Sequence, residues 1–438
     1  MTETQTAVTP TPEQPPRERR TYRSTLRAAE IDARLVGMVM ALAAIWISFH
    51  VMSGGTFLTP RNLWNLSVQT APVAIMATGM VLVIVSRSID LSVGSMLAVL
   101  GMAMALIQAE ILPGFIGFDH PATWFIALVV GLFLGALIGA FQGAIVAYVG
   151  VPSFLVTLGG LLVWRGVAWA LSSGRTIAPL DTTFRNLGGG SGGTIGGAWS
   201  WVVGVVACLG ILALLVNARR QRQRYGFTLR PLWAEVSLAV LACGTVLGGI
   251  GVLNRYYLPP QLARQYAEDR GIEWPAGGLN ISIGLAYPVL IALAVAMIMT
   301  YIATRRRFGR YVYAIGGNPE AAELGGINTK RTIVKTFMLM GMLVALAAAV
   351  STARLNAAVS GLGQLSELYV IAAAVIGGTS LAGGVGSIPG AILGALVMQS
   401  LQSGMVLMGV DAPLQNIVVG VALVIAVTLD TVYRRRAV

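Results

Sequence analysis

Long uncharged apolar stretches, separated by short polar segments, dominate the chain. Asp, Glu, Lys and Arg are absent from positions 35–60, 62–86, 120–164, 186–218 and 368–410. An uncharged stretch of about 18 residues or more predicts a membrane-spanning helix, because a charge at the centre of a bilayer costs about 2.5–3.5 kcal/mol even on the most lenient scale. The pattern therefore predicts a polytopic membrane protein built from α-helices.

Twelve hydrophobic segments follow one another along the chain. They lie at about residues 35–53, 70–86, 92–109, 122–149, 153–172, 199–217, 233–253, 281–303, 332–352, 368–383, 388–409 and 413–432. The segment at 368–383 is short and interrupted by glycines, so we expect some segments to be broken or re-entrant helices. The predicted fold class is an all-α polytopic membrane protein with about twelve transmembrane segments.

The basic residues give the predicted orientation. Lys and Arg gather in the cytoplasmic loops of membrane proteins, and most of the 30 in this chain fall on one side if the twelve segments alternate. We expect both termini on that side. Residues 1–34 are expected to form a partly disordered cytoplasmic tail, not a cleavable signal, and residues 35–435 a single transmembrane domain.

Composition excludes several classes of function. The chain is 56% hydrophobic and 11% charged, whereas soluble domains carry about 25% charged residues. Its net charge of +12 is explained by basic cytoplasmic loops, so we expect no nucleic-acid partner. The two cysteines lie in apolar stretches and the two histidines stand alone, which predicts neither a disulfide framework nor a metal site.

Catalytic motifs are missing from the sequence. It contains no G-x-x-x-x-G-K-[ST] loop for ATP phosphates and no H-E-x-x-H pair. The letters G-x-S-x-G occur at residues 189–193, but inside the run GGGSGG at 188–193, which is typical of a flexible linker and not of a nucleophile elbow. We therefore expect a transport subunit without catalytic residues and without an ATPase site of its own. The missing motifs also argue against a membrane-embedded enzyme. Energy for uptake must come from a partner or from an ion gradient.

Glycines at every fourth position mark one face of the fourth segment, at Gly131, Gly135, Gly139 and Gly143. Small residues at this spacing let membrane helices approach closely, so we expect a helix-packing face there and no ligand site.

The loop at 313–331 is predicted to contain a short helix with its own caps. Asn318 is a good N-cap residue, and Pro319 suits the first helical position. Glu320 lies near the positive end of the helix dipole, and Gly325 or Gly326 can end the helix in the left-handed conformation. Because a helix of about six residues does not persist alone in water, something must hold it.

Two interpretations of this short helix compete. One is a capped surface turn without a partner. The other is a docking element, which the small side chains of Ala321 and Ala322 favour because they allow close approach.

Glu-Ala-Ala followed by a glycine and an isoleucine on such a loop resembles the coupling helix of the permease subunits of bacterial ABC importers. The resemblance implies that a cytoplasmic ATPase contacts Asn318, Pro319, Glu320, Ala321, Ala322, Gly325, Gly326 and Ile327. Further stretches resemble the sugar permeases of this group, those for ribose, galactose and xylose. They are residues 88–95 (SIDLSVGS), 151–159 (VPSFLVTLG), 165–166 (RG), 353–355 (ARL) and 376–384 (IGGTSLAGG).

Two departures from the ribose-type pattern point to the xylose subgroup. Residues 199–280 look like an inserted helix pair added to a ten-span core. Ribose-type members usually carry an acidic residue two positions after the residue that is Glu367 here, where this chain has Leu368-Tyr369. The resemblance therefore makes D-xylose the first substrate candidate, although the sugar itself is expected to be selected largely by a binding protein.

The resemblance also implies the partners and the place of action. A second copy of the chain would complete the pathway, a cytoplasmic ATP-binding subunit would carry ATP and Mg²⁺, and a periplasmic sugar-binding protein would dock outside. The chain itself would bind no cofactor. It would be a multi-pass protein of the bacterial inner membrane, surrounded by lipid.

Eight polar residues within or beside the spans are candidates for the sugar pathway. They are Ser88, Asp90, Ser92, Gln142, Thr157, Asn356, Gln399 and Gln402. Hydrogen bonds between helices explain the neutral ones equally well. For Asp90 the alternatives are a gating role and a local pair with Arg87, one turn earlier.

For three large side chains we favour contact with the membrane interface over contact with the sugar. Arg165 and Arg354 are expected to reach toward headgroups at the outer face. Trp164 is expected to belong to an outer aromatic belt.

A stand-alone, ion-coupled sugar transporter remains the alternative function, since twelve crossings suit it as well. It predicts titratable residues at mid-membrane. Asp90 and Glu367 are instead expected near the edges of their spans.

Overall fold

The computed structural model describes residues 33–268, 271–275 and 277–435. These residues are almost entirely helical, and the described part of the chain contains only isolated β-bridges and no strand. The tail predicted over residues 1–34 lies outside the described residues except for its last two positions. The all-α fold class is confirmed.

The long helices follow the order of the hydrophobic segments. They are α2 (Ala33–Met52), α3 (Pro60–Val85), α4 (Val93–Leu106), α6 (Thr123–Ala144), α7 (Ser153–Ser172), α9 (Gly196–Arg224), α10 (Leu232–Leu253), α12 (Tyr287–Arg305), α15 (Thr329–Leu355), α17 (Ile388–Leu407) and α18 (Ala412–Arg435). Shorter elements lie between them: η1 (Ile107–Ile111), α5 (Pro113–Ile116), η2 (Ile145–Val149), α8 (Thr182–Arg185), η3 (Asn186–Gly188), α11 (Pro260–Glu268), α13 (Arg307–Gly317), α14 (Pro319–Leu324) and α16 (Ser366–Ile376).

Ten helical stretches in the described residues are long and apolar enough to cross a membrane, and α16 and the apolar part of α18 are shorter. With 11 residues and a rise of about 1.5 Å per residue, α16 covers about half of a 30 Å hydrocarbon layer. The prediction of a broken helix at 368–383 is thus confirmed. The full count of twelve crossings stays a prediction.

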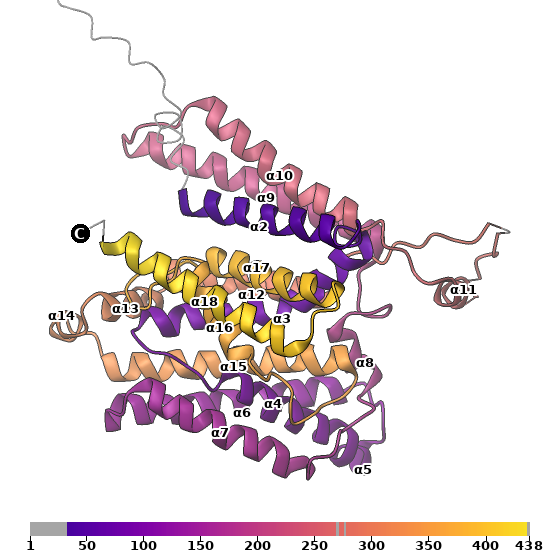
Figure 1. The fold of residues 1–438 in the computed structure, drawn as a ribbon, viewed down its shortest axis with the longest axis horizontal. Helices are drawn as coiled ribbons and strands as arrows, with labels where there is room; N and C mark the ends of the chain where they lie inside the picture. The colour runs from indigo at the N-terminus through magenta and orange to yellow at the C-terminus, as the bar shows by residue number, and fades with distance from the viewer. Residues whose placement is uncertain (1–32, 269–270, 276, 436–438) are drawn as a thin grey trace, which may run out of the picture.

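The helices run side by side between two ends of the molecule (Figure 1). One end, here the α14 end, carries α13, α14 and the turn between α9 and α10. The opposite end, the α8 end, carries α5, α8 and α11. The start of α2 and the end of α18 both lie at the α14 end, as an even number of crossings requires.

The glycine stripe of α6 lies against α15 and α4. A Cβ atom added to Gly135 would collide with the carbonyl oxygen of Gly341, and one on Gly139 with that of Phe337. Gly143 meets Phe337 and Val334 in the same way, whereas Gly131 meets Met104 of α4. The predicted packing face is confirmed, because the backbone of α15 leaves no room for a side chain at Gly135 and Gly139.

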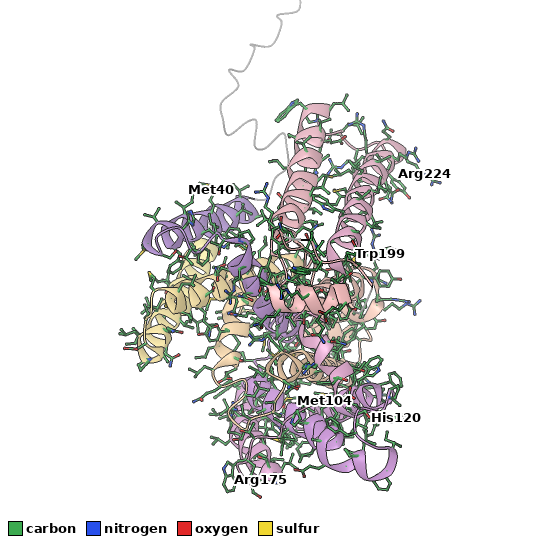
Figure 2. All side chains as sticks on the ribbon, turned by 90° about the vertical axis from the view of Figure 1, so that its right-hand side faces the viewer. Met40, Met104, His120, Arg175, Trp199 and Arg224 are labelled. Carbon is green, nitrogen blue, oxygen red and sulfur yellow. The ribbon has the colours of Figure 1, made fainter. Side chains whose placement is uncertain are left out.

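The inserted pair, α9 and α10, stands apart from this core. Figure 2 shows it extending from one side of the bundle, with Trp199 where α9 begins and Arg224 at its far end. The two helices pack chiefly on each other, and an ion pair of 2.6 Å joins Arg219 Nη1 to Glu235 Oε2 near the α14 end. Most of their apolar side chains are exposed outside this chain.

Candidate coupling and translocation sites

The short helix α14 has the predicted caps. Asn318 is its N-cap, and the Asn318 Oδ1 atom accepts a hydrogen bond of 3.0 Å from the Ala321 amide. Gly326, at φ +81°, supplies the left-handed residue after the helix, whereas Gly325 has φ −75°. The Ile327 amide then donates to the Ala322 carbonyl at 3.0 Å, which completes a Schellman stop.

The two faces of α14 differ in burial. Ala322 is buried against the rest of the chain, while Glu320, Ala321 and Glu323 are exposed. Leu324 is 91% exposed, an unusual state for a leucine at the tip of a short helix outside the apolar spans. The helix is therefore held on one face and free on the other.

Three segments meet where α13 ends, and we call this meeting point the α13 junction. Arg87 of the α3–α4 connector donates through Nε to the Gly316 carbonyl at 2.8 Å and through Nη2 to the Gly317 carbonyl at 2.7 Å. The α16–α17 connector joins from the other side, since the Gly384 amide donates to the Val85 carbonyl at 3.0 Å and Tyr313 Oη donates to the Gly386 carbonyl at 2.9 Å.

The α13 junction leaves no room for a side chain at Gly316. A Cβ atom there would overlap the carbonyl oxygen of Val85 and lie 2.5 Å from the Gly384 amide nitrogen. The helix pair α13–α14 is thus bonded directly to the connectors that lead into α4 and α17.

Of the two alternatives for Asp90, the local pair with Arg87 is wrong. Arg87 adopts the left-handed backbone region, at φ +62°, and its guanidinium turns to α13. Asp90 is 1% exposed and its Oδ1 atom instead accepts hydrogen bonds from the Ser92 amide at 2.9 Å and the Ser92 hydroxyl at 2.6 Å.

A polar cluster surrounds Asp90 at the start of α4. The Ser92 hydroxyl lies 3.1 Å from Gln142 Oε1 of α6. Thr157 of α7 donates to the Ile89 carbonyl at 3.1 Å, and the Ile89 amide donates to Ser153 at 3.1 Å. Asp90 and Ser92 of the α3–α4 connector are thus brought together with Gln142 of α6 and Thr157 of α7, and Ser88 lies buried on the same connector.

Two hydrogen-bond donors in this cluster are left over. Gln142 Nε2 and Trp164 Nε1 are buried, and the described residues give neither an acceptor. Both lie next to Gly160, where an added Cβ would come within 3.2 Å of Trp164 Nε1 and closer still to Gln142 Nε2. Trp164 therefore turns its N–H inward, not to an outer aromatic belt as we expected.

The other three candidates lie elsewhere. Gln399 of α17 donates to Gln402 Oε1 at 3.1 Å and to Gln69 Oε1 of α3 at 3.3 Å, forming a glutamine cluster. Asn356 caps the end of α15, and its Oδ1 atom accepts from the Leu180 amide at 3.1 Å. The candidates therefore form two separate groups and one residue at the α8 end.

Glu367 and Asp90 lie near the ends of their helices, as expected, and both are buried. Glu367 lies in the first turn of α16, is 8% exposed, and lies against Gly94 in the first turn of α4. Asp90 lies between the end of α3 and the start of α4. Arg165 does not reach for headgroups, because its Nη1 atom donates to the carbonyls of Ser360 and Leu362 at 2.9 and 2.8 Å.

Sequence reasoning missed three residues that shape these sites. Arg87, Tyr313 and Gln69 each bond to a segment more than 70 positions away. The acceptors of Arg87 and Tyr313 are main-chain carbonyls, so no residue type on the other side signals the contact. Gln69 is a polar residue in an apolar segment, and this is the one feature of the sequence that could have indicated a contact between helices.

The chain matches known permeases over nearly its whole length. Residues 62–427 match the family described as the branched-chain amino acid transport system permease component. The chain is 38% identical to the xylose transport system permease protein XylH of Escherichia coli (strain K12), over 93% of this chain and 94% of that protein. It is 37% identical to the XylH protein of Haemophilus influenzae (strain ATCC 51907 / DSM 11121 / KW20 / Rd), over 93% and 98%.

A third relative is more distant. The ribose import permease protein RbsC of Escherichia coli (strain K12) is 32% identical over 89% of this chain and 92% of its own length. No solved structure matches the chain. Together with the ten apolar helices, these relatives identify a multi-pass protein of the bacterial inner membrane. The chain belongs to the family of the branched-chain amino acid transport system permease components.

Proposed function

We propose that the chain is the transmembrane permease subunit of an ATP-driven importer of a pentose, with D-xylose as the first candidate. The observation that carries this proposal is α14, a helix capped at both ends, exposed on one face and bonded through the α13 junction to two connectors of the bundle. The substrate class is supported by the names of the relatives.

In this proposal a separate cytoplasmic ATPase binds α14. Its contact surface consists of Asn318, Pro319, Glu320, Ala321, Gly325, Gly326 and Ile327, together with the protruding Leu324, whereas Ala322, which the sequence placed on this surface, is buried and holds the helix to the chain. ATP and Mg²⁺ bind the partner, and this chain contributes no nucleotide site. Movement of α14 passes to α4 through Arg87, because two charge-assisted hydrogen bonds resist separation better than neutral ones.

The pathway in this proposal passes the cluster around Asp90. A sugar hydroxyl accepts hydrogen bonds from Gln142 Nε2 and Trp164 Nε1, the two donors without an acceptor in the described residues. Gln399 and Gln402 offer a second polar step, and Asn356 holds the α8 end of α15. Such neutral groups bind a sugar weakly enough to release it.

The proposed assembly contains two copies of this chain and a periplasmic sugar-binding protein at the α8 end. Lipid covers the exposed apolar side chains of α9 and α10. The assembly works as a two-state bundle whose states the ATPase and the binding protein prefer differently.

Uptake by proteoliposomes that contain the whole transporter tests the proposal. Glu320→Arg and Gly326→Arg should abolish ATP-dependent uptake while membrane insertion stays intact, because one reverses a charge on α14 and the other strains the left-handed residue that ends it. Gln223→Arg adds a positive charge at the same end on the inserted pair and should leave uptake unchanged. Equal uptake by all three variants would refute the coupling role of α14.

Leu324 gives a sharper test of ATPase binding. Since Leu324 is 91% exposed, Leu324→Glu should leave the unfolding temperature of the isolated chain unchanged. It should weaken binding of the ATPase subunit by about tenfold or more, because it buries an unpaired charge in the proposed apolar contact. Unchanged affinity in a binding assay would exclude Leu324 as an anchor.

A stand-alone, ion-coupled transporter is the second candidate, and the burial of Asp90 and Glu367 favours it. Vesicles that contain this chain alone distinguish the two. Sugar accumulation driven by a proton gradient, without ATPase or binding protein, would support the second candidate and overturn the first.

A further inference from the structure

A cavity of about 900 Å³ opens where the inserted pair joins the core near the α8 end. Its wall is built from the start of α9, the residue that ends α10, one residue of α11 and the segment at 281–283. It shares no lining residue with the Asp90 cluster or the glutamine cluster. Its size lies within the range of about 300–1,000 Å³ that small-molecule sites occupy.

Asn254, the C-cap residue of α10, places an unused acceptor in this wall. The side chain is 8% exposed, and its Nδ2 atom donates to the Gly197 carbonyl at 3.2 Å. This bond uses Nδ2 as the donor and leaves Oδ1 as the free acceptor of the amide. The Oδ1 atom is buried, and no donor in the described part of the chain reaches it. A buried acceptor without a donor destabilises the folded protein, and a bound O–H or N–H donor would remove that cost.

The rest of the wall determines the chemistry of the occupant. Trp199, Trp201 and Tyr266 supply aromatic surface, and Thr194 and Ser282 supply hydroxyl groups. None of the described residues that line the cavity is charged. An ionic ligand would therefore lose water without gaining a counter-charge, whereas a neutral ligand with apolar C–H faces and many hydroxyls fits both kinds of surface.

We propose that this cavity binds a neutral carbohydrate at the outer face of the protein, apart from the transport pathway. A hydroxyl group of the sugar donates to Asn254 Oδ1, and a C–H face of the sugar packs on the indole ring of Trp199. The sugar can be free in solution or the headgroup of a glycolipid, because the two present the same chemistry. The proposal does not depend on which energy source drives uptake.

Calorimetric titration of the full chain in phospholipid nanodiscs tests the proposal. D-xylose, D-glucose and maltose are the probes, and D-glucuronate is the charged comparison. We expect at least one neutral sugar to bind with a millimolar or lower Kd and glucuronate to bind at least tenfold more weakly. A second set of nanodiscs containing monoglucosyl diacylglycerol should raise the unfolding temperature if the natural source is a lipid headgroup.

Asn254→Leu removes the acceptor at similar volume and should weaken sugar binding at least tenfold. Because Asn254 also bonds to Gly197, this variant can fail to fold, so Trp199→Ala provides an independent test at a side chain that is 66% exposed. Trp233→Ala, an exposed tryptophan at the other end of the inserted pair, is the matched control and should bind normally.

Each possible result either supports or overturns the proposal. Binding of a free sugar, or stabilisation by the glycolipid alone, that is lost in Trp199→Ala and kept in Trp233→Ala supports the proposal and identifies the source. No binding of any probe overturns it, and so does binding that neither Asn254→Leu nor Trp199→Ala affects. Crosslinking of a cysteine at position 199 to the periplasmic binding protein, unaffected by millimolar sugar, would assign the cavity to a protein partner and also overturn it.

Discussion

The helices α6 and α10 are similar in sequence and different in surroundings. Their mean hydropathy is 2.5 and 2.2, and both carry glycines four residues apart. In α6 these glycines meet α15 and α4 at distances that exclude a side chain, whereas Gly244 and Gly248 of α10 have no other atom within 4 Å of an added Cβ. The same glycine spacing thus packs against other helices in α6 and has no packing partner within this chain in α10.

The core of the bundle and the inserted pair, to which α6 and α10 belong, also differ in burial. The apolar window of α15 is 61% buried in this chain, whereas that of α10 is 6% buried. The core is therefore built from contacts within the chain. The inserted pair relies on its own two helices, on one ion pair, and on whatever surrounds it in the membrane.

The largest effect should come from filling the two glycine faces. Gly139→Leu places a side chain against the Phe337 carbonyl and should destabilise the chain by about 3 kcal/mol or more, at the upper end of overpacking costs. Gly248→Leu should change little. Thermal unfolding in detergent, with the yield of monodisperse protein, measures both. A similar loss in Gly248→Leu would show that α10 also packs on something essential.

The arginines of the two regions provide the next test. Arg87→Ala removes both bonds to α13 and should lower ATP-driven uptake about tenfold or more, while ATP hydrolysis by the partner continues. Arg219→Ala breaks only the ion pair with Glu235 inside the inserted pair and should leave uptake near normal. Arg87→Lys keeps the charge but not the two-pronged geometry.

The ratio of sugar transported to ATP hydrolysed is the decisive measurement for these arginines. We expect this ratio to fall for Arg87→Ala, with Arg87→Lys intermediate, because the α13 junction transmits movement. A proportional fall in both rates would indicate a merely structural role for Arg87.

The smallest effect concerns a carboxyl group at the α8 end of the core. Asp181 is fully buried, and its Oδ1 atom caps α8 by accepting from the Phe184 amide at 2.7 Å. Burial, and in addition the neighbouring Asp119 carboxylate, raises the pKa of Asp181. Glu235 of the inserted pair, by contrast, is neutralised by Arg219.

The sign of the pH effect follows from the raised pKa of Asp181. The folded state prefers the protonated acid, so this favourable contribution is complete below the unfolded pKa of about 3.9 and is lost as the pH rises through the folded value. Asp181→Asn keeps the Oδ1 cap without the charge. Its unfolding temperature should exceed that of the parent protein at pH 7 and match it at pH 3.5. A gain that is equal at both pH values would contradict this account.

Sequence alone predicted the elements better than their connections. Charge-free stretches located the helices, the four glycines of α6 located a packing face, and Asn318 with Gly326 defined α14, because each of these signals acts within a few residues. The start of α3 at Pro60 was missed, since Arg61 and two asparagines in its first turns look like loop residues. A local pair with Asp90 was the one partner that the sequence offered for Arg87, and it was one of two alternatives. The carbonyls that Arg87 binds lie 229 and 230 positions away, so the sequence did not indicate them.

The Arg87 contact also shapes how the protein can change by mutation. Its two acceptors are peptide oxygens, which every amino acid carries, so replacing Gly317 leaves its own acceptor in place. Arg87 itself cannot be replaced in this way, because no substitution at positions 316 or 317 supplies the donors that a lost guanidinium leaves missing. A search for paired substitutions among related permeases would therefore miss this contact. Its trace would be an invariant arginine at position 87 and a position 317 that accepts other residues.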